Sequence, residues 1–293
     1  MELPLIVGVD GSESSLLAVD WAVDEADRLG LPVRLVHAWL WELYEGGAFA
    51  YGLPGPSLHV SGEEARRIVD LAAERAGRRS AAVKISTEVL PEDTEAALLR
   101  ASRNATALIT GSRGRGPIAG LLLGSVSLAM ASRALCPVVV VRGSEASRNS
   151  EHGRIVIGVG DATNGVAAIR FAFREAEARH CTLDAVRAWR RPAHETTGLP
   201  LASGESARHH REHASALLED ALRVPARDHP SVHVRGSVVE GPAHKILVDR
   251  TGAADLLVLG GRRHGRVGPQ LGRVAHALLH HADCPVAVVP QRG

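Results

Sequence analysis

The sequence predicts an α/β protein in which one unit occurs twice: two tandem open parallel sheets of five strands, each flanked by helices. Two observations favour this fold. Short apolar segments rich in β-branched residues alternate with amphipathic segments at helical spacing, which is the pattern of strand, helical crossover and parallel strand. Similar segments also recur halfway along the 293 residues, a length that suits two domains.

The repeat is clearest at the two ends of each half. Residues 6–11 read IVGVDG and residues 155–161 read IVIGVGD, while LCPVVVV at 135–141 returns as DCPVAVV at 283–289. A polar stretch, RGSEASRNSEHG, joins the halves and has the composition of a linker. We therefore expect one domain over 1–143, a linker over 144–152 and a second domain over 153–293.

Five segments of the first half are expected to be strands and four to be helices. The strands are expected at 4–10, 33–38, 83–90, 107–110 and 138–141. Cap residues, glycine and proline predict helices from Ser12 to Gly30, over 63–79, from Asp93 or Thr94, and from Ser125 with an end before Pro137. The second half repeats the strands at 154–159, 182–188, 232–239, 255–259 and 286–289.

The segment 41–62 interrupts this pattern directly after the second strand. It combines glycine and proline with four aromatic residues, which is too irregular for a regular element. Two interpretations remain open, a lid over a ligand cleft and a packed crossover loop.

Composition argues against several classes of protein. The 34 Lys and Arg residues balance 33 Asp and Glu residues, so the net charge of +1 gives no field that would attract nucleic acid or acidic lipid. Three widely spaced cysteines do not form a disulfide framework and indicate a reducing compartment. The chain shows neither a secretory leader nor a stretch of about 18 apolar residues. We therefore expect a cytoplasmic protein with no membrane or nucleic acid partner.

The stretch GSRGRGPIAGLLLGS, which begins at Gly111, carries the clearest functional signal. Gly111 and Gly114 allow a sharp turn and a close approach of the backbone to a ligand. The chain then re-enters a helix at Gly124, Ser125 and Val126. The N–H groups and partial positive charge of a helix N-terminus favour phosphate, so this stretch predicts a phosphate-binding loop.

Charged residues near this loop indicate which ligand it suits. Asp10 closes the first strand and Gly111 the fourth, and open parallel sheets bind ligands at the carboxyl ends of their strands. Asp10 could accept a hydrogen bond from a ribose hydroxyl or a base amino group, which favours a nucleotide, or it merely caps the helix near Ser12. Arg113 and Arg115 either screen phosphate charge or are solvated loop arginines.

Together these residues resemble those of a known family. The spacing G-x2-G-x9-G-[ST], an aspartate that closes a first strand IVGVD, and a last strand CPVVVV resemble the ATP-binding universal stress proteins. The resemblance covers nearly the whole chain, twice, and is similar to the tandem two-domain form of actinobacteria. It implies an adenine-nucleotide alpha-hydrolase-like fold with strand order 3-2-1-4-5. It also implies self-association, of the two units or of two chains, through the last strands at 138–141 and 286–289.

The same resemblance implies a ligand and a set of residues that bind it. The ligand is ATP, with Mg²⁺ as a candidate companion. Asp10 would contact the ribose or adenine, the backbone of Ala38 the base, and the loop and following helix the phosphates. The candidate binding residues are Gly8, Val9, Asp10, Ala38, Gly111, Arg113, Gly114, Gly124, Ser125 and Val126.

The second half departs from this motif. Its Gly160, Arg263 and Arg273 stand where the first half has Asp10, Gly114 and Ser125. An arginine in place of a glycine also restricts the backbone turn. We therefore expect the first half to bind ATP and the second to bind it weakly or not at all. The alternative is that Arg262, Arg263 and Arg273 grip phosphate through their side chains.

Histidines of the second half suggest two further interpretations. His209, Glu212 and His213 spell H-x-x-E-H, the shape of a zinc-peptidase motif, but they lack an identifiable third ligand, so a solvated helix face is favoured. His276 and His280 stand four apart and could bind a metal adventitiously. No catalytic or metal-binding residue is therefore assigned.

The expected function is that of a cytoplasmic, ATP-binding regulatory protein with a role in the stress response. Neither a Walker lysine nor an evident general base accompanies the loop, so at most a weak ATPase activity is expected. Two alternatives remain open. One is a slow nucleotide hydrolase or adenylyl-transfer enzyme that uses the same cleft with magnesium, and the other is a scaffold that binds no nucleotide. The residues do not indicate a protein partner.

Overall fold

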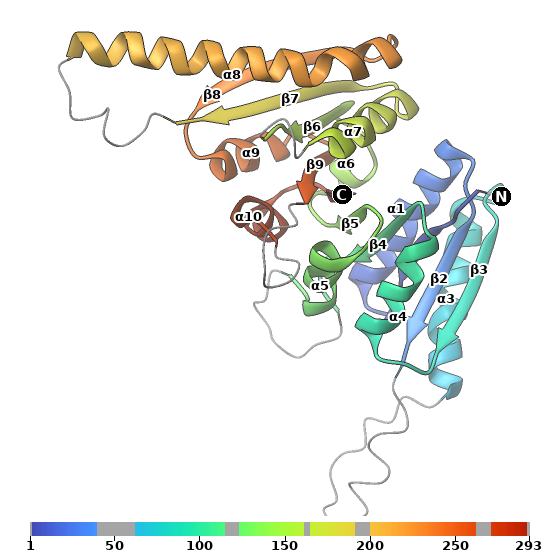
Figure 1. The fold of residues 1–293 in the computed structure, drawn as a ribbon. Coiled ribbons are helices and arrows are strands. Elements are labelled where there is room, and N and C mark those ends of the chain that lie inside the picture. Colours follow the sequence, from blue (N-terminus) through green and yellow to red (C-terminus); the bar gives the residue numbers. More distant parts are fainter. Residues whose placement is uncertain are drawn as a thin grey trace, which may run out of the picture. The chain divides into compact units, whose positions relative to one another are not determined.

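Two α/β units make up the chain, unit 1 (Met1–Val141) and unit 2 (Arg142–Gly293) (Figure 1). The structure is a computed structural model that describes residues 2–39, 62–114, 123–160, 165–190, 200–261 and 271–291. Each unit has five parallel strands with helices on both faces, which confirms the predicted fold class. The predicted lid or crossover loop at 41–62 lies outside the described residues, apart from Gly62.

The strands of unit 1 adopt the expected order β3-β2-β1-β4-β5. The central strand β1 (Leu5–Gly8) pairs with β2 (Val33–Ala38) on one side and with β4 (Ala107–Gly111) on the other. The outer strands are β3 (Ile85–Leu90) and β5 (Val138–Val141). Residues 9 and 10, predicted as strand, follow the end of β1 and turn toward the first helix. The carboxyl ends of β2, β1 and β4 therefore lie next to one another.

The helices of unit 1 begin and end where the cap signals predict. They are α1 (Glu13–Leu29), α3 (Gly62–Arg79), α4 (Thr94–Ala101) followed by a short 3₁₀ turn (Ser102–Asn104), and α5 (Ser125–Arg133). Ser12 Oγ accepts from the N–H of Ser15 at 3.2 Å, and Gly30 ends α1 with a φ of 67°. Asp93 caps α4 by accepting from the N–H of Ala96 at 3.0 Å.

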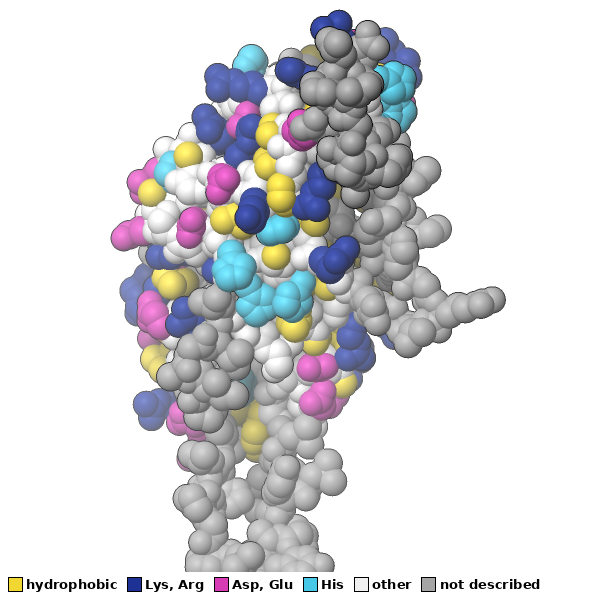
Figure 2. Space-filling model, turned by 90° about the vertical axis from the view of Figure 1, so that its left-hand side faces the viewer, with side chains coloured by type: hydrophobic (Ala, Val, Ile, Leu, Met, Phe, Trp, Pro, Cys, Tyr) yellow, Lys and Arg dark blue, Asp and Glu magenta, His cyan; other side chains and the backbone are white. Residues whose placement is uncertain are grey.

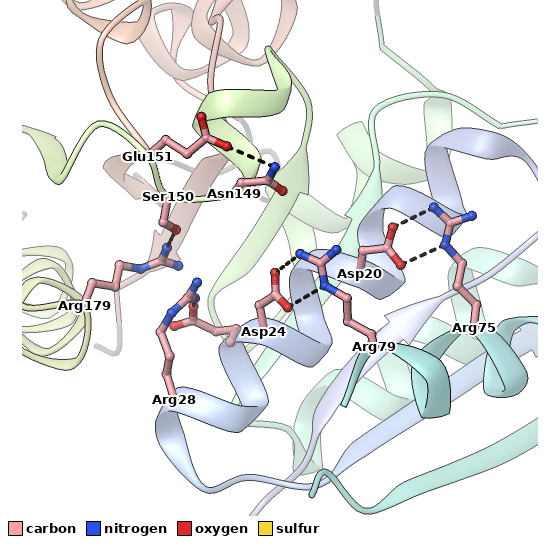
Figure 3. Close-up of polar contacts among 10 residues, drawn as sticks. Asp20, Asp24, Arg28, Arg75, Arg79, Asn149, Ser150, Glu151 and Arg179 are labelled. Atoms are coloured by element: carbon pink, nitrogen blue, oxygen red, sulfur yellow. Dashed lines mark hydrogen bonds and ion pairs between the residues drawn. The ribbon is translucent and has the colours of Figure 1, made fainter. Parts of the chain in front are cut away.

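Two bidentate ion pairs hold α1 against α3 (Figure 3). Arg75 donates to both carboxylate oxygens of Asp20 at 2.8 and 2.6 Å, and Arg79 donates to both oxygens of Asp24 at 2.7 and 2.7 Å. The hydrogen bond with Asp20 raises the pKa of Arg75 above its ordinary value, and Asp24 does the same for Arg79. Because the guanidinium fork matches a carboxylate in geometry, these pairs fix the register of the two helices.

Unit 2 repeats the topology with the order β8-β7-β6-β9-β10. Its strands are β6 (Arg154–Gly158), β7 (Thr182–Trp189), β8 (Val234–Glu240), β9 (Leu256–Gly261) and β10 (Val286–Pro290). Its helices are α6 (Glu145–Arg148), α7 (Val166–Ala178), α8 (Pro200–Asp228), α9 (Ala243–Thr251) and α10 (Arg273–His281). The longest, α8, has 29 residues. Across the described ranges, no helix combines the length and apolar character needed to cross a membrane.

The predicted linker at 144–152 contains the short helix α6, which Ser144 caps. Asp255 accepts from the N–H groups of His152 and Arg154 at 2.9 Å each, and so orients the entry into β6. Arg179, just after α7, donates to Ser150 Oγ at 2.6 Å (Figure 3). The polar residues of this stretch therefore make ordered contacts within unit 2.

The three cysteines differ in how deeply they are buried. Cys136 and Cys284 are buried, and burial raises the pKa of the Cys284 thiol well above its ordinary value, whereas Cys181 is half-buried. Because the thiolate is the reactive form, we expect one thiol, that of Cys181, to react with Ellman's reagent in the native protein and three to react in denaturant. The variant Cys181→Ser should remove the native reaction, and a second native thiol that reacts at a similar rate would contradict this prediction.

Candidate functional site

The candidate residues of unit 1 lie at the ends of two adjacent strands. Residues of β1 pair directly with β4, for example Leu5 with Ala107 and Val7 with Ile109, so no strand separates the two carboxyl ends. Asp10 follows β1 by two residues, and Gly111 is the last residue of β4. The aspartate and the glycine loop therefore lie at one sheet edge, as the nucleotide hypothesis requires.

Asp10 orients the start of α1 but does not cap that helix. Its Oδ1 accepts from the N–H of Ser12 at 2.9 Å and from Ser12 Oγ at 2.6 Å. Ser12 in turn caps α1 through the N–H of Ser15. Ser12 is therefore the N-cap of α1, and the half-buried Asp10 carboxylate at the strand end holds that cap residue in place.

Two glycines make room for close contacts at this edge. A Cβ atom built on Gly114 would lie 2.7 Å from Asp10 Oδ2, so the aspartate and the loop are direct neighbours. A Cβ atom built on Gly111 would lie 2.5 Å from the backbone oxygen of Ser14. Because no real Cβ contact is that short, Gly111 allows the end of β4 to lie against the first turn of α1, while Gly114 leaves space for a carboxylate.

Hydrogen bonds hold the loop after β4 between α1 and α5. The N–H of Arg113 donates to Ser14 Oγ at 3.1 Å, and the N–H of Gly124 donates to the carbonyl of Ser112 at 2.8 Å. Ser127 Oγ donates to the carbonyl of Gly111 at 2.7 Å. Ser14, Ser112 and Ser127 are structural members of the site that the sequence analysis missed. Their partners lie 12 to 99 residues away, so the one available signal was the serine-rich composition of both segments.

The N-terminus of α5 is positioned to bind an anion. Gly124 precedes the helix in an extended conformation and provides no side-chain cap. Ser125 is exposed and Val126 is half-buried, so the first backbone N–H groups lie near the surface. Arg113 is exposed beside the loop. The predicted Arg115 belongs to residues 115–122, which lie outside the described part of the chain.

The remaining candidates are Ala38, on the neighbouring strand β2, and Gly8 and Val9, which directly precede Asp10. Ala38 is the last residue of β2, and its carbonyl lies 3.5 Å from the donor Thr94 Oγ1. The buried Val9 donates its N–H to the carbonyl of Val36 at 2.9 Å, which continues the sheet beyond β1. Gly8 lets α4 approach, because a Cβ atom there would lie 3.2 Å from Leu98 Cδ1. Ala38, Asp10 and the loop thus follow one another along the edge in the order β2, β1, β4.

His37 is a buried residue that holds the backbone at this sheet edge. Its side chain is only 8% exposed, and Nδ1 lies 2.7 Å from the carbonyl oxygen of Val9. Since a carbonyl can only accept, Nδ1 carries the hydrogen and His37 fixes the backbone just before Asp10. The role of His37 is therefore structural positioning.

Unit 2 has a cavity at the corresponding sheet edge. The cavity measures about 350 Å³ and lies at the ends of β6, β7 and β9, beside α9 and the N-terminus of α10. Gly160 and Arg273, predicted to replace Asp10 and Ser125, both line it. Arg262, Arg263 and Asp161 belong to stretches outside the described residues.

Histidine side chains gather on the face drawn in Figure 2, and α10 supplies three that lie close together. The ring centroids of His276 and His280 are 4.7 Å apart, and those of His280 and His281 are 6.2 Å apart. Burial lowers the pKa of His280, and the nearby His276 lowers it further. His209, Glu212 and His213 are exposed on α8. In the described part of the chain, no group of three or more His, Cys, Asp or Glu side chains is placed to hold a metal ion.

Comparisons with known proteins bear on both units. The Universal stress protein family matches residues 3–142 and 151–290. The universal stress protein Rv2005c of Mycobacterium tuberculosis H37Rv is 32% identical over 298 residues, which cover 98% of this chain and 97% of that protein. Rv2624c of the same strain is 30% identical over 289 residues, covering 97% and 95%. The crystal structure of a universal stress protein from Archaeoglobus fulgidus DSM 4304 shares the fold, with a TM-score of 0.69 at 16% identity and coverage of 99% and 98%.

Proposed function

The chain belongs to the universal stress protein family, and on that basis we propose that it is an ATP-binding regulatory protein whose nucleotide site lies in unit 1. One observation supports the proposal most strongly. Asp10, the glycine loop after β4 and the N-terminus of α5 meet at adjacent strand ends. Open parallel sheets bind ligands at such ends, and a carboxylate beside a phosphate cradle suits a nucleotide better than free phosphate.

The phosphates of ATP suit the loop and helix half of the site. The first N–H groups of α5 have no side-chain cap, so they can donate to phosphate oxygens, and the helix macrodipole favours the negative charge. Gly114 and Gly124 keep the backbone accessible there. The exposed Arg113 adds a cation and Ser125 a hydroxyl, and both favour the ionised phosphate chain.

The order of strands orients the nucleoside. Because β1 lies between β2 and β4, a nucleotide along the edge with its phosphates at the β4 loop places its ribose at Asp10 and its base near Ala38. A carboxylate has about four acceptor positions, so Asp10 can accept from a ribose hydroxyl while Oδ1 keeps its bonds to Ser12. Gly8 and Val9 contribute the backbone that leads into this position.

We expect ATP to act as a bound signal that is turned over slowly at most. His37 is only 8% exposed, so water has little access to its basic Nε2 atom, and Asp10 Oδ1 already accepts two hydrogen bonds from Ser12. Mg²⁺ suits this site chiefly through the phosphates of ATP, with Asp10 as the candidate carboxylate ligand. A cytoplasmic location and self-association through the last strands belong to the same proposal.

The proposal predicts one ATP per chain. Mass spectrometry of the small molecules released when freshly purified protein is denatured identifies the ligand and counts occupied sites. Calorimetric titration of nucleotide-depleted protein with ATP, with and without Mg²⁺, should give one site, and phosphate release should stay at background. Two ATP molecules per chain would contradict the assignment to unit 1 alone. No binding of any adenine nucleotide would remove the proposal.

A further inference from the structure

The cavity of unit 2 differs in chemistry from the site of unit 1. Its volume of about 350 Å³ lies at the small end of the range for ligand pockets. Among the described residues that line it, Arg273 carries the one charged or polar side chain, and all the others are glycine, alanine, valine or leucine. The walls formed by Val186, Leu247 and Leu259 are aliphatic, so the cavity suits an apolar group better than a ribose.

Replacements at equivalent positions explain this difference. The strands pair in the same register in both units, with Gly8 opposite Val36 and Gly158 opposite Val186. By this equivalence, four polar side chains of unit 1 are lost in unit 2. Asp10 corresponds to Gly160 and Thr94 to Ala243, while Thr110 corresponds to Leu259 and Ser127 to Ala275. The cavity has therefore exchanged hydrogen-bonding groups for apolar surface and has lost its carboxylate.

The charge at the sheet edge changes sign at the same time. Arg187 stands where unit 1 has His37, and its side chain is only 9% exposed. Arg187 Nη1 donates to the carbonyl of Gly160 and lies 3.5 Å from the carbonyl of Val159. A buried guanidinium thus holds the backbone at the position that carries the Asp10 carboxylate in unit 1, so unit 2 has a cation near this edge and no carboxylate at Gly160.

Arg273 supplies a second cation at the mouth of the cavity. It is the first residue of α10, is exposed, and follows Gly272, which provides no side-chain cap. A cation at a helix N-terminus opposes the macrodipole, and this cost disappears when an anion lies between the side chain and the N–H groups. The position is therefore suited to one acidic head group bound by Arg273 and α10 together.

We propose that this cavity binds a small amphipathic acid, a ligand with one acidic head group on a compact apolar body. The head group binds Arg273 and the first N–H groups of α10, while the body packs against Val186, Leu247 and Leu259. Aliphatic walls stabilise the body by removing apolar surface from water. The site goes beyond the ATP site proposed for unit 1 and shares no residue with it.

The fluorescent probe 8-anilinonaphthalene-1-sulfonate tests this site, because it joins one sulfonate to an apolar body. Titrated into the full chain, it should give one site with enhanced emission that saturating ATP with Mg²⁺ does not displace. Arg273→Gln should weaken this binding by about tenfold, because a charge-assisted bond to the head group is lost. Arg235→Gln is the matched control, since Arg235 is exposed on β8 outside the cavity, and it should leave the affinity unchanged.

Gly160→Asp is the converse test. A Cβ atom at Gly160 meets no atom within 4 Å, so the cavity accepts the side chain, which restores the carboxylate of unit 1 and should repel the probe by at least about tenfold. The melting temperature of each variant reports folding, and Arg273→Gln decides alone if Gly160→Asp does not fold. Probe binding that neither change affects, or probe displacement by ATP, would overturn the proposal. Because neither variant touches unit 1, its ATP stoichiometry separates this outcome from a failure of the ATP site.

Discussion

Asp10→Ala is expected to weaken ATP binding by about ten- to a hundredfold, because hydrogen bonds to a charged group are among the strongest single contacts. The loss should appear in calorimetric titration of nucleotide-depleted protein. The melting temperature should change by only a few degrees, since the N–H and hydroxyl of Ser12 that lose their acceptor are half-buried and water can replace it. A loss of affinity without a loss of fold is the signature of a binding residue.

Three variants make this result specific. Asp10→Asn keeps an acceptor for Ser12 and should lose less affinity than Asp10→Ala. Gly114→Ala should weaken ATP binding by a different route, because its Cβ atom would lie 2.7 Å from Asp10 Oδ2 and push the carboxylate aside. Asp70→Ala removes an exposed carboxylate on α3 and should bind ATP normally. Unchanged affinity in both Asp10→Ala and Gly114→Ala would remove the assignment of the site.

The fold could be predicted from sequence because its signals are local. Alternation of apolar strands and capped helices was enough to predict parallel sheets, and Ser12 and Gly30 bound α1 as expected. The strand order came from the family resemblance and agrees with the observed pairing. The ends of elements were less predictable. The strand expected to reach Asp10 ends at Gly8, and after one more sheet hydrogen bond, from Val9 to Val36, the chain turns toward α1.

The site was only partly predictable because half of its structure depends on distant contacts. Asp10, Gly111 and Gly114 stood out by residue type and spacing, and the pairing of β1 with β4 brings them together. The supporting roles of Ser14 and His37 could not be predicted in the same way. Each contacts backbone or side-chain atoms of another element, Ser14 at Arg113 and His37 at Val9, and no local pattern encodes such a partner.

The tight approach of Gly111 to α1 gives the second prediction, which concerns stability. Gly111→Ala is expected to destabilise unit 1 by about 1–3 kcal/mol, the usual cost of overpacking. Its Cβ atom would lie 2.5 Å from the backbone oxygen and 2.6 Å from the backbone carbon of Ser14. These atoms belong to the first turn of α1, which Ser12 and Asp10 already hold, so neither side can move cheaply. Urea unfolding followed by circular dichroism measures the loss.

Gly77→Ala provides the matched comparison, because the same change at a different glycine should have the opposite sign. Gly77 lies inside α3, where a Cβ atom meets nothing within 4 Å, and alanine is a better helix former by roughly 1 kcal/mol.

Gly111→Ala should also weaken ATP binding, since the shift of β4 against α1 moves the loop away from Asp10. Gly111 and Gly114 thus differ in their first effect: the former acts through backbone and lowers stability, whereas the latter displaces only a side-chain carboxylate. If Gly111→Ala unfolded at the same urea concentration as the unmodified chain, β4 and the first turn of α1 could not lie as close as the site requires.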